Sequence, residues 1–392
     1  MVSATVVIAL LDKSWPPDHS FVRGMLAQAA ASQEDIKMRL VVSRQEAGTR
    51  RVRRYERAAC VIGMAPRRHI WRVLNLFFVL KLCLHQIWVE RKRGRKVVFF
   101  VRNDPVMLLG ASILRPWSSR LVFQSSFPHE IYSRGWGKKA FARLLYRLAG
   151  CRVDAVTGVS PLGVERVLEY CPNAIKGPHI PLLSDFGVNR GAVPSRNRCG
   201  ETLRFIYIGS HSSAREIGLV VEAIVVALGG GSRSNFSFVG ASESEMRALR
   251  SIVGVEDWLD RGRIAFSGPV PRPDIPKLLS EADVGMSLIP PRPAFIESSP
   301  TKLAEYLSSG LLVIASKGIP MQEKFVNASG AGILVDWDIT AIAEGIRQLE
   351  RISSNEREQF RKQGRGFAER ELSYRSYRGT FRSLIGLGEI KK

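Results

Sequence analysis

The sequence has few cysteines, few acidic residues in its first half and no secretion signal at its start. Its five cysteines are scattered over 392 residues, without a CxxC pair or an even disulfide framework. Such cysteines are typical of reduced thiols in the cytosol rather than of a disulfide-stapled secreted fold. Residues 1–10 lack a basic segment and a long apolar run, so they predict a first buried strand rather than a signal peptide.

Signatures of metal and nucleic-acid binding are also missing. The sequence contains no HExxH, no paired Cys/His spacing and no isolated Asp-x-Asp. No RNA-binding motif is present either. We therefore expect no metal ion and no nucleic-acid partner.

The most hydrophobic stretch, residues 73–89, is too short and too polar for a membrane span. It has 17 residues and is interrupted by Asn75, Lys81, His85 and Gln86. A spanning helix needs about 20 apolar residues with few charges. We expect a helix packed on the core, and its basic flank leaves open that it also dips into a membrane interface.

Positive charge is concentrated in the first half of the chain. Of the formal net charge of +22, residues 1–200 contribute +20, from 33 Lys and Arg against 13 Asp and Glu, whereas residues 201–392 have 25 against 23. A generally basic proteome would explain a high isoelectric point but not this asymmetry. A polyanion or an anionic bilayer surface is the expected neighbour of the first half.

Short apolar runs alternate with helical patterns along the whole chain, which predicts an α/β fold. At 45% hydrophobic composition the chain is long enough for two domains with separate cores. Residues 187–200 are aperiodic and contain Gly, Pro, Ser and Arg, so they predict a linker between domains at 1–186 and 201–371. The predicted strands are residues 6–11, 38–43, 97–101, 121–124, 155–160, 205–208, 235–240, 264–268, 283–288, 311–316 and 331–335. The cluster at residues 50–57 predicts a solvated or membrane-facing segment instead.

Residues 297–310 predict a short helix with an anion site at its start. Ser299 is a suitable N-cap, Pro300 suits the first helical position, and Gly310 suits a left-handed stop. Lys302 falls in the first turn, where the helix dipole favours an acid. A lysine beside free backbone N–H groups suits a phosphate.

Two carboxylates, Glu297 and Glu305, bracket this anion site. Acceptor-only side chains so placed suit hydroxyl groups on either side of a diphosphate, as in a nucleotide sugar. The alternative interpretation is a solvated loop acid and an ordinary helix-surface acid. A retaining hydrolase pair is not expected, because such carboxyls lie about 5–5.5 Å apart.

Other candidate residues follow predicted strands. Gly209 and Ser210 end a strand just before a helix, where a glycine lets a ligand approach the backbone closely. His129 lies in a loop after a strand, at the sheet edge where open α/β folds bind ligands. His19, in the loop after the first strand, is a weaker candidate for the acceptor site.

The run Ser-Pro-Thr-Lys-Leu-x-Glu-Tyr-Leu, with the Glu-x7-Glu pattern around it, resembles the C-terminal signature of the retaining GT-B glycosyltransferases of family 4. The resemblance implies two Rossmann-like domains facing across a cleft, with residues 372–392 crossing back to complete the first. Two departures stand out. Leu182-Leu183 replaces an Asn-Gly pair usual at the end of the first domain. Arg215 is the single basic residue at a place where two are common in the family, so Lys302 is expected to contribute more to binding the diphosphate.

The resemblance also implies roles for residues. Glu297 would hold donor-sugar hydroxyls and Glu305 the ribose, and His129 would face the donor sugar and the transferred group. The helix start at Ser299, Pro300 and Thr301, the glycine loop at Gly209 and Ser210, and the cations Arg215 and Lys302 would bind the diphosphate.

We therefore expect a retaining, metal-independent hexosyltransferase that needs no cofactor beyond its nucleoside-diphosphate sugar donor. The expected acceptor is a lipid-linked saccharide or lipopolysaccharide precursor of bacterial surface polysaccharide synthesis. The protein would be cytoplasmic and attached peripherally to the inner face of the plasma membrane. One alternative is a GT-B-shaped sugar-nucleotide epimerase, which leaves the basic half unexplained. Another is a non-catalytic membrane- or nucleic-acid-binding adaptor, against which the intact Glu297, Glu305 and Arg215 argue.

Overall fold

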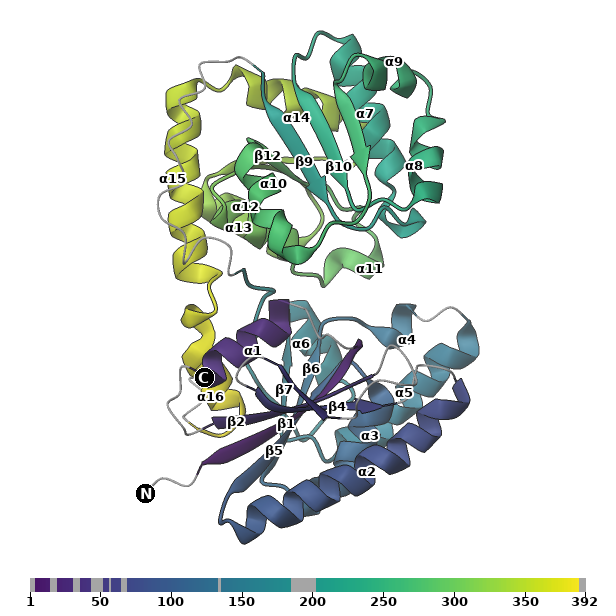
Figure 1. Cartoon of the computed structure of the whole chain (residues 1–392), viewed down its shortest axis with the longest axis vertical. Helices are drawn as coiled ribbons and strands as arrows, with labels where there is room; N and C mark the ends of the chain where they lie inside the picture. Colours follow the sequence, from purple (N-terminus) through teal and green to yellow (C-terminus); the bar gives the residue numbers. More distant parts are fainter. Residues whose placement is uncertain are drawn as a thin grey trace. The chain divides into compact units, whose positions relative to one another are not determined.

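The computed structural model describes residues 4–14, 20–30, 36–43, 52–55, 58–64, 69–132, 135–184 and 202–387. The chain forms two compact units, each with its own sheet and core (Figure 1). Unit 1 comprises Met1–Pro181 with Tyr374–Lys392, and unit 2 comprises Leu182–Ser373. These boundaries lie a few residues from the predicted 186 and 371. The predicted linker, residues 187–200, is outside the described residues.

Unit 1 contains a mostly parallel sheet whose described strands lie in the order β3-β4-β2-β1-β5-β6-β7-β8. The strands are β1 (Thr5–Ser14), β2 (Ile36–Ser43), β3 (Val52–Tyr55), β4 (Ala58–Met64), β5 (Lys96–Arg102), β6 (Arg120–Ser125), β7 (Ala155–Gly158) and β8 (Ile175–Lys176). The prediction for residues 50–57 was wrong in part, because β3 pairs antiparallel with β4. Charged residues are common on such edge strands, where they discourage pairing with another chain.

Helices cover both faces of this sheet. On one face lie α2 (His69–Lys92), α3 (Pro105–Leu114), α5 (Trp136–Gly150) and α6 (Pro161–Leu168), packed over inward residues such as Ile8, Phe99 and Phe123. On the other face lie α1 (Ser20–Ala30) and α16 (Arg378–Leu384), and Phe100 meets Phe381 with ring centroids 6.0 Å apart (Figure 1). The C-terminal segment is thus part of unit 1.

The hydrophobic stretch at 73–89 is the middle of α2. Val79, Cys83 and Ile87 recur every four residues and are buried against the sheet. Within the part of the chain that the structure describes, no helix has the length and apolar character needed to cross a membrane.

Unit 2 contains an entirely parallel sheet in the order β11-β10-β9-β12-β13-β14. The strands are β9 (Arg204–Ile208), β10 (Asn235–Val239), β11 (Ile264–Ser267), β12 (Val284–Ser287), β13 (Leu312–Ser316) and β14 (Gly332–Val335). Along β9, Phe205 and Tyr207 face one core and Ile206 and Ile208 face the other. A parallel strand covered on both sides is expected to be apolar throughout.

Two helical layers enclose the sheet of unit 2 (Figure 1). One layer holds α7 (Ile217–Gly229), α8 (Glu243–Arg250), α9 (Val255–Asp260) and α14 (Ile339–Arg351). The other holds α10 (Ile275–Glu281), α12 (Thr301–Ser308), α13 (Pro320–Ser329) and α15 (Ser354–Glu371). The short helix α11 (Pro293–Ile296) precedes α12.

The order of strands in unit 2 creates a switch point beside β9. From β9 the chain continues to β10 and β11 on one side, then returns to β12 on the other side. The loops after β9 and β12 therefore diverge at the carboxyl edge of the sheet. Open α/β sheets bind ligands in the crevice at such a point.

Candidate functional site

The loops at the switch point contain most of the residues singled out in the sequence. The loop after β9 includes Gly209, Ser210 and Arg215, and the loop after β12 leads through α11 to Glu297. Helix α12 follows at once and contains Lys302 and Glu305. Unit 2 alone therefore supplies these residues from three neighbouring segments.

Gly209 allows the lysine of α12 to lie against the backbone at the end of β9. Its φ is +144°, and a Cβ atom built there would lie 1.9 Å from Lys302 Nζ. Gly240, after β10, has φ +108°, and its Cβ would lie 2.7 Å from the Gly209 carbonyl oxygen. Glycine is therefore needed at both positions for conformation and for space.

The Lys302 ammonium packs on the phenol of Tyr207. Its Nζ lies 4.5 Å from the centre of the ring and 3.4 Å from the hydroxyl oxygen, to which it donates. The Tyr207 hydroxyl in turn donates to the Ser210 carbonyl at 2.9 Å. The lysine is thereby fixed over the glycine loop by a cation–π contact and a hydrogen bond.

Burial, together with repulsion from Arg215, lowers the pKa of Lys302 from 10.5 to about 7, while Glu305 acts in the opposite sense. Removing an ammonium from water disfavours its charged form. A site that holds cations so unfavourably gains most from an anionic ligand, because the ligand's charge offsets both effects.

Arg215 and Glu216 connect the loop after β9 to the turn that precedes Glu297. The Arg215 guanidinium lies 4.4 Å from the centre of the Phe295 ring. The Glu216 carboxylate accepts two hydrogen bonds from Arg292, at 2.8 and 2.9 Å, and a third from the Trp337 indole N–H at 3.3 Å. Glu216 adopts φ +48°, a left-handed conformation that is strained for a residue with a side chain.

The two predicted carboxylates lie on either side of the start of α12. Glu297 is half-buried at the end of α11. Glu305 is buried within α12, and its Oε1 accepts from Arg272 Nη1 at 3.2 Å. A buried carboxylate needs such a partner, so the interpretation of Glu305 as an ordinary helix-surface acid is wrong.

The start of α12 differs from its prediction by one residue. Pro300 occupies the cap position, Thr301 is the first helical residue, and no side chain caps the helix. Ser299 is buried and its hydroxyl accepts from the Leu182 backbone N–H at 3.2 Å, so it is not the N-cap. The predicted stop at Gly310 is confirmed by its φ of +71°. An uncapped first turn keeps its N–H groups for another acceptor.

Two residues near the site were missed in the sequence. His211 is buried, its ring centre is 5.1 Å from that of Tyr207, and neither ring nitrogen makes a hydrogen bond of normal geometry. Burial lowers its pKa, although the nearby carbonyls of Gly209 and Gly240 favour its charged form. The Ser298 hydroxyl is likewise buried without a partner. Buried polar atoms without partners are uncommon and call for an explanation.

Tyr306 fixes the position of α12 against the sheet. Its hydroxyl accepts from the Ile208 backbone N–H at 3.1 Å, and a Cβ on Gly285 would lie 2.3 Å from its ring. The tyrosine therefore packs through a gap that only glycine leaves. This packing holds the start of α12 beside the end of β9.

In unit 1, His129 begins the short helix α4 (His129–Tyr132) after β6, and its ring centre lies 5.1 Å from that of Phe127. A buried polar cluster joins the neighbouring strand ends: Asn103 Nδ2 donates to Asp12 Oδ2 at 2.9 Å, Arg102 pairs with Asp12, and Arg102 Nη2 donates to Ser126 Oγ at 2.7 Å. Sequence reasoning did not select this cluster. His19 lies outside the described residues.

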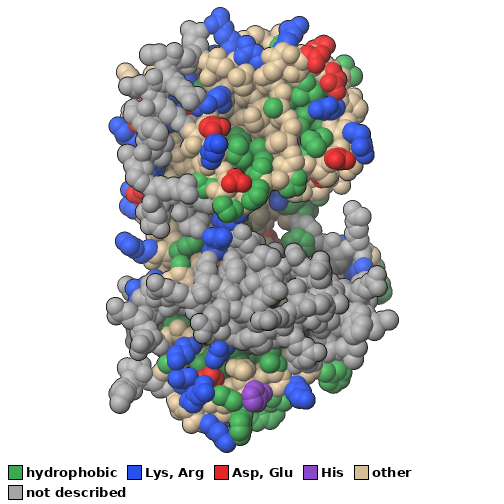
Figure 2. All heavy atoms as spheres, in the orientation of Figure 1, with side chains coloured by type: hydrophobic (Ala, Val, Ile, Leu, Met, Phe, Trp, Pro, Cys, Tyr) green, Lys and Arg blue, Asp and Glu red, His purple; other side chains and the backbone are tan. Residues whose placement is uncertain are grey.

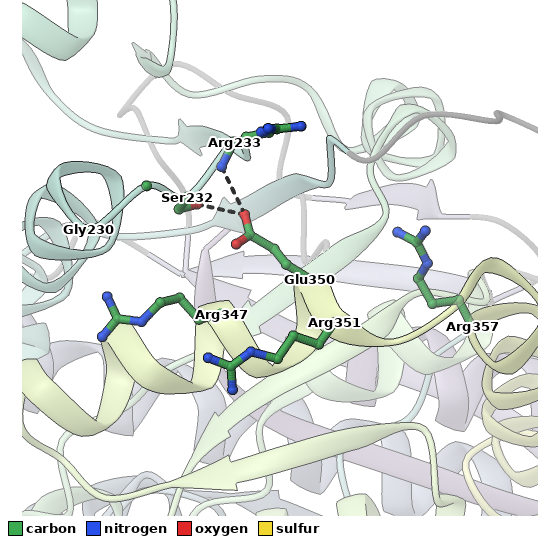
Figure 3. A pocket seen from close by; sticks show the side chains of 8 residues that line it. Gly230, Ser232, Arg233, Arg347, Glu350, Arg351 and Arg357 are labelled. Carbon is green, nitrogen blue, oxygen red and sulfur yellow. Dashed lines mark hydrogen bonds between the residues drawn. The ribbon is translucent and has the colours of Figure 1, made fainter.

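A pocket of about 370 Å³ lies at the amino ends of the strands of unit 2, beside the loop that precedes β10 (Figure 3). Its arginines are partly matched by acids, since Arg347 and Arg351 each pair with Glu344 at 3.0 Å. Glu350 accepts from the Ser232 hydroxyl at 2.6 Å and the Arg233 backbone N–H at 3.2 Å. These contacts connect α14 to the loop before β10, far along the strands from the glycine loop, so we do not assign the site here. The lining residues are Gly230, Gly231, Ser232, Arg233, Arg347, Glu350, Arg351 and Arg357.

Among the residues that the structure describes, no group of three or more His, Cys, Asp or Glu side chains is arranged to hold a metal ion.

Comparisons with known proteins agree with the fold. Residues 205–367 match the family model of the glycosyl transferases group 1. The comparison with curated proteins found no match.

Solved structures resemble the chain over nearly its whole length. Sucrose-phosphate synthase from Thermosynechococcus elongatus has a TM-score of 0.71 at 13% identity, over 97% of this chain and 98% of that one. Anabaena HepE in complex with UDP and glucose has a TM-score of 0.67 at 13% identity, over 97% and 98%. An E. coli structure described as trehalose-6-phosphate bound with UDP-2-fluoro glucose has a TM-score of 0.68 at 11% identity, over 97% and 99%.

At identities of 11–13%, these structural similarities indicate the fold alone. The two α/β units with parallel sheets have the GT-B fold, as predicted. The range that matches the glycosyl transferases group 1 model includes the glycine loop, Lys302 and both carboxylates.

Proposed function

We propose that the protein is a retaining hexosyltransferase of family 4 that uses a nucleoside-diphosphate sugar as donor. The observation that carries this proposal is the position of Lys302. Its ammonium lies on Gly209 and Tyr207 at the switch point of a glycosyl transferases group 1 domain, beside the uncapped start of α12. An ammonium group beside free backbone N–H groups at a helix start suits the negative charge of a diphosphate.

The donor diphosphate would be held by Lys302, Arg215 and the first backbone N–H groups of α12. As the bond to the sugar breaks, negative charge develops on the leaving nucleotide, and preorganised cations and N–H groups stabilise it. Because Lys302 and Arg215 supply two positive charges, the proposal includes metal independence. The buried His211 ring and the Ser298 hydroxyl give two further polar groups within these loops.

The sugar and ribose would be held by the carboxylates. Glu297 would accept from the hexose hydroxyls and Glu305 from the ribose, with Arg272 holding the Glu305 carboxylate in place. His129 of unit 1 would face the transferred group. The complexes of Anabaena HepE with UDP and glucose and of the E. coli structure with UDP-2-fluoro glucose make UDP-sugars the first donors to test.

We further propose that the acceptor is a lipid-linked saccharide, or a lipopolysaccharide precursor, of bacterial surface polysaccharide synthesis. The support is the concentration of positive charge in the first 200 residues, which suits an anionic bilayer. The protein would then work in the cytoplasm, attached peripherally to the inner face of the plasma membrane.

The test is a transfer assay with purified protein, a panel of nucleotide sugars and membrane lipid extract. We expect release of nucleoside diphosphate together with a new glycosidic bond that keeps the anomeric configuration, and loss of both in Glu297→Gln. Transfer that continues unchanged in the variant would refute the role of Glu297. Nucleotide release without a new bond would favour the alternative, a sugar-nucleotide epimerase of the same fold, and no turnover of any donor would refute both enzymes.

A further inference from the structure

Large apolar side chains are exposed almost entirely on unit 1. Of the fifteen large hydrophobic residues exposed in the described part of the chain, thirteen belong to unit 1 and two, Val226 and Val253, to unit 2. The thirteen are Phe77, Leu84, Trp88, Ile113, Trp117, Phe127, Ile131, Trp136, Phe141, Leu144, Leu148, Leu162 and Ile175. Single exposed hydrophobic residues are ordinary, but a concentration on one part of a surface marks an interaction site.

The outward side of α5 is apolar where a solvent-facing helix would be polar. Phe141, Leu144 and Leu148 follow the three-to-four spacing of one helical stripe and are each more than half exposed. The opposite stripe, which includes Leu145 and Tyr146, is buried against the unit. Helix α5 therefore has two apolar sides, and the core accounts for only one of them.

Helix α2 repeats this arrangement. Phe77, Leu84 and Trp88 lie seven and four residues apart on one stripe and are exposed, whereas Val79, Cys83 and Ile87 are buried. Lys92, one turn after Trp88, places its Nζ 3.7 Å from the centre of the indole ring. An aromatic ring next to a cation is the combination that Trp and Lys form at membrane interfaces.

The two helices lie on the same face of the sheet, with α3 between them (Figure 1). Helix α3 packs closely on α2, since a Cβ on Gly110 would lie 2.7 Å from Leu76. Ile113 at the end of α3 and Trp117 just after it add exposed apolar groups. We call the outer surface of α2, α3 and α5 the helical face, and in Figure 2 hydrophobic and basic side chains mix along the lower edge of unit 1, where α2 runs.

The charges on the helical face have one sign. Helix α5 has four basic residues, Lys138, Lys139, Arg143 and Arg147, and no acid. The single acid of α2 and α3, Glu90, is buried and ion-paired with Arg39, Arg93 and Arg95. Beside the face, Asp104 accepts from the first backbone N–H groups of α3 and Asp154 pairs with Arg115, so neither adds an unmatched negative charge.

We propose that the helical face docks on an anionic lipid bilayer, with Phe141, Leu144, Leu148 and the tryptophans entering the interface. Apolar side chains flanked by lysine and arginine match the boundary between acyl chains and negative headgroups. A second copy of this face is a poor partner, because a two-fold dimer would place the same positive charges against each other.

This inference rests on the proposed function for its purpose, since a lipid-linked acceptor must be reached at a membrane. The helical face is the surface through which the protein would reach that acceptor. It includes α3 and α5, which the hydrophobic run at 73–89 alone did not indicate. The inference also stands on its own observations, because the exposed stripe of α5 lies outside the domain that holds Lys302.

The test is sedimentation of the full chain with vesicles of phosphatidylcholine, with and without phosphatidylglycerol, in the absence of donor and acceptor. We expect binding only to the anionic vesicles, with weakening in high salt. Leu144→Glu with Leu148→Glu should weaken binding about tenfold or more, because acids replace apolar groups at the interface. Arg143→Glu with Arg147→Glu should do the same for the anionic vesicles. Val253→Glu, at a 92% exposed position in unit 2, is the matched control and should bind as wild type.

Thermal unfolding of each variant checks that these exposed substitutions leave the fold intact. Wild-type protein that fails to bind the anionic vesicles, or Leu144/Leu148 variants that bind as well as wild type, would overturn the inference. It would also be overturned if light scattering showed a wild-type dimer that becomes monomeric in those variants, since the face would then bind protein. Because no sugar nucleotide is used, failure of the transferase activity leaves this result unaffected.

Discussion

Replacing Lys302 by methionine should stabilise the protein while removing its response to nucleotide. Burial and the nearby Arg215 lower the lysine pKa from 10.5 to about 7, so the folded protein holds this ammonium unfavourably. Methionine has a similar length and no charge to desolvate. We therefore expect Lys302→Met to unfold at a higher temperature than wild type near neutral pH.

The size of the effect follows from the pKa difference. Each pKa unit corresponds to about 1.4 kcal/mol, so the fall from 10.5 to about 7 means that the lysine lowers the free energy of unfolding by at most about 5 kcal/mol. The side chain as a whole is partly exposed although its ammonium is enclosed, so solvent screening lowers the expectation to about 1–3 kcal/mol. For a unit of this size that is a rise in Tm of about 3–10 °C.

The pH dependence gives the sharper measurement. Below about pH 7 the folded and unfolded chains both hold the proton, and the whole penalty is present. Between about 7 and 10.5 only the unfolded chain still holds it, so the penalty in wild type shrinks as pH rises. The advantage of Lys302→Met should therefore be largest below pH 7 and disappear near pH 10.5.

Differential scanning calorimetry across this pH range, with and without UDP, is the assay. Saturating UDP should raise the Tm of wild type, since a ligand at 100 times its Kd adds about 2.7 kcal/mol, and should leave Lys302→Met almost unchanged. Lys302→Arg is the control, because it changes the side chain but keeps a positive charge at the position. A methionine variant that is less stable at pH 6, or a stability difference that does not shrink at high pH, would refute the reasoning.

Three further predictions concern the same loops. Glu305→Gln should lower turnover at least about tenfold, because a neutral amide pairs weakly with both Arg272 and a ribose, and unchanged turnover in a donor-saturated assay would contradict its role. Gly209→Ala should raise the KM for donor strongly, because a Cβ would lie on the Lys302 ammonium, and a normal KM would show that the lysine can move aside without effect. Glu216→Gly should unfold near the wild-type temperature, since relief of left-handed strain of about 1 kcal/mol offsets the lost ion pair. Its KM for donor should rise with little change in kcat. Equal KM values for the variant and the wild type would show that the contacts of Glu216 do not contribute to donor binding.

Local sequence signals were sufficient for much of unit 2. The strands of that unit are short apolar runs, and Gly310 ends α12 in the left-handed conformation expected of a glycine stop. Lys302 could be selected because it breaks the charge preference of a first helical turn. Its position on Gly209 and Tyr207, however, joins segments almost a hundred residues apart, which a local pattern does not contain.

The errors have similar physical causes. Ser299 has the right residue type for an N-cap, but its hydroxyl accepts from Leu182, a contact across the fold that competes with capping. The strand pair β3–β4 was missed because charge outweighed strand propensity at residues 50–57. The cluster of Asp12, Arg102 and Asn103 forms only when β1 and β5 lie side by side, so nothing in either segment alone indicates it.

The contacts of Glu216 have a consequence for how this sequence can change in evolution. A residue with a side chain is tolerated in the left-handed conformation here because its carboxylate is held by Arg292 and Trp337. A mutation of Glu216, Arg292 or Trp337 removes a hydrogen-bond partner from the remaining residues, so the three positions should be inherited together. Homologues with glycine at position 216 have no strain to offset and should show free variation at positions 292 and 337.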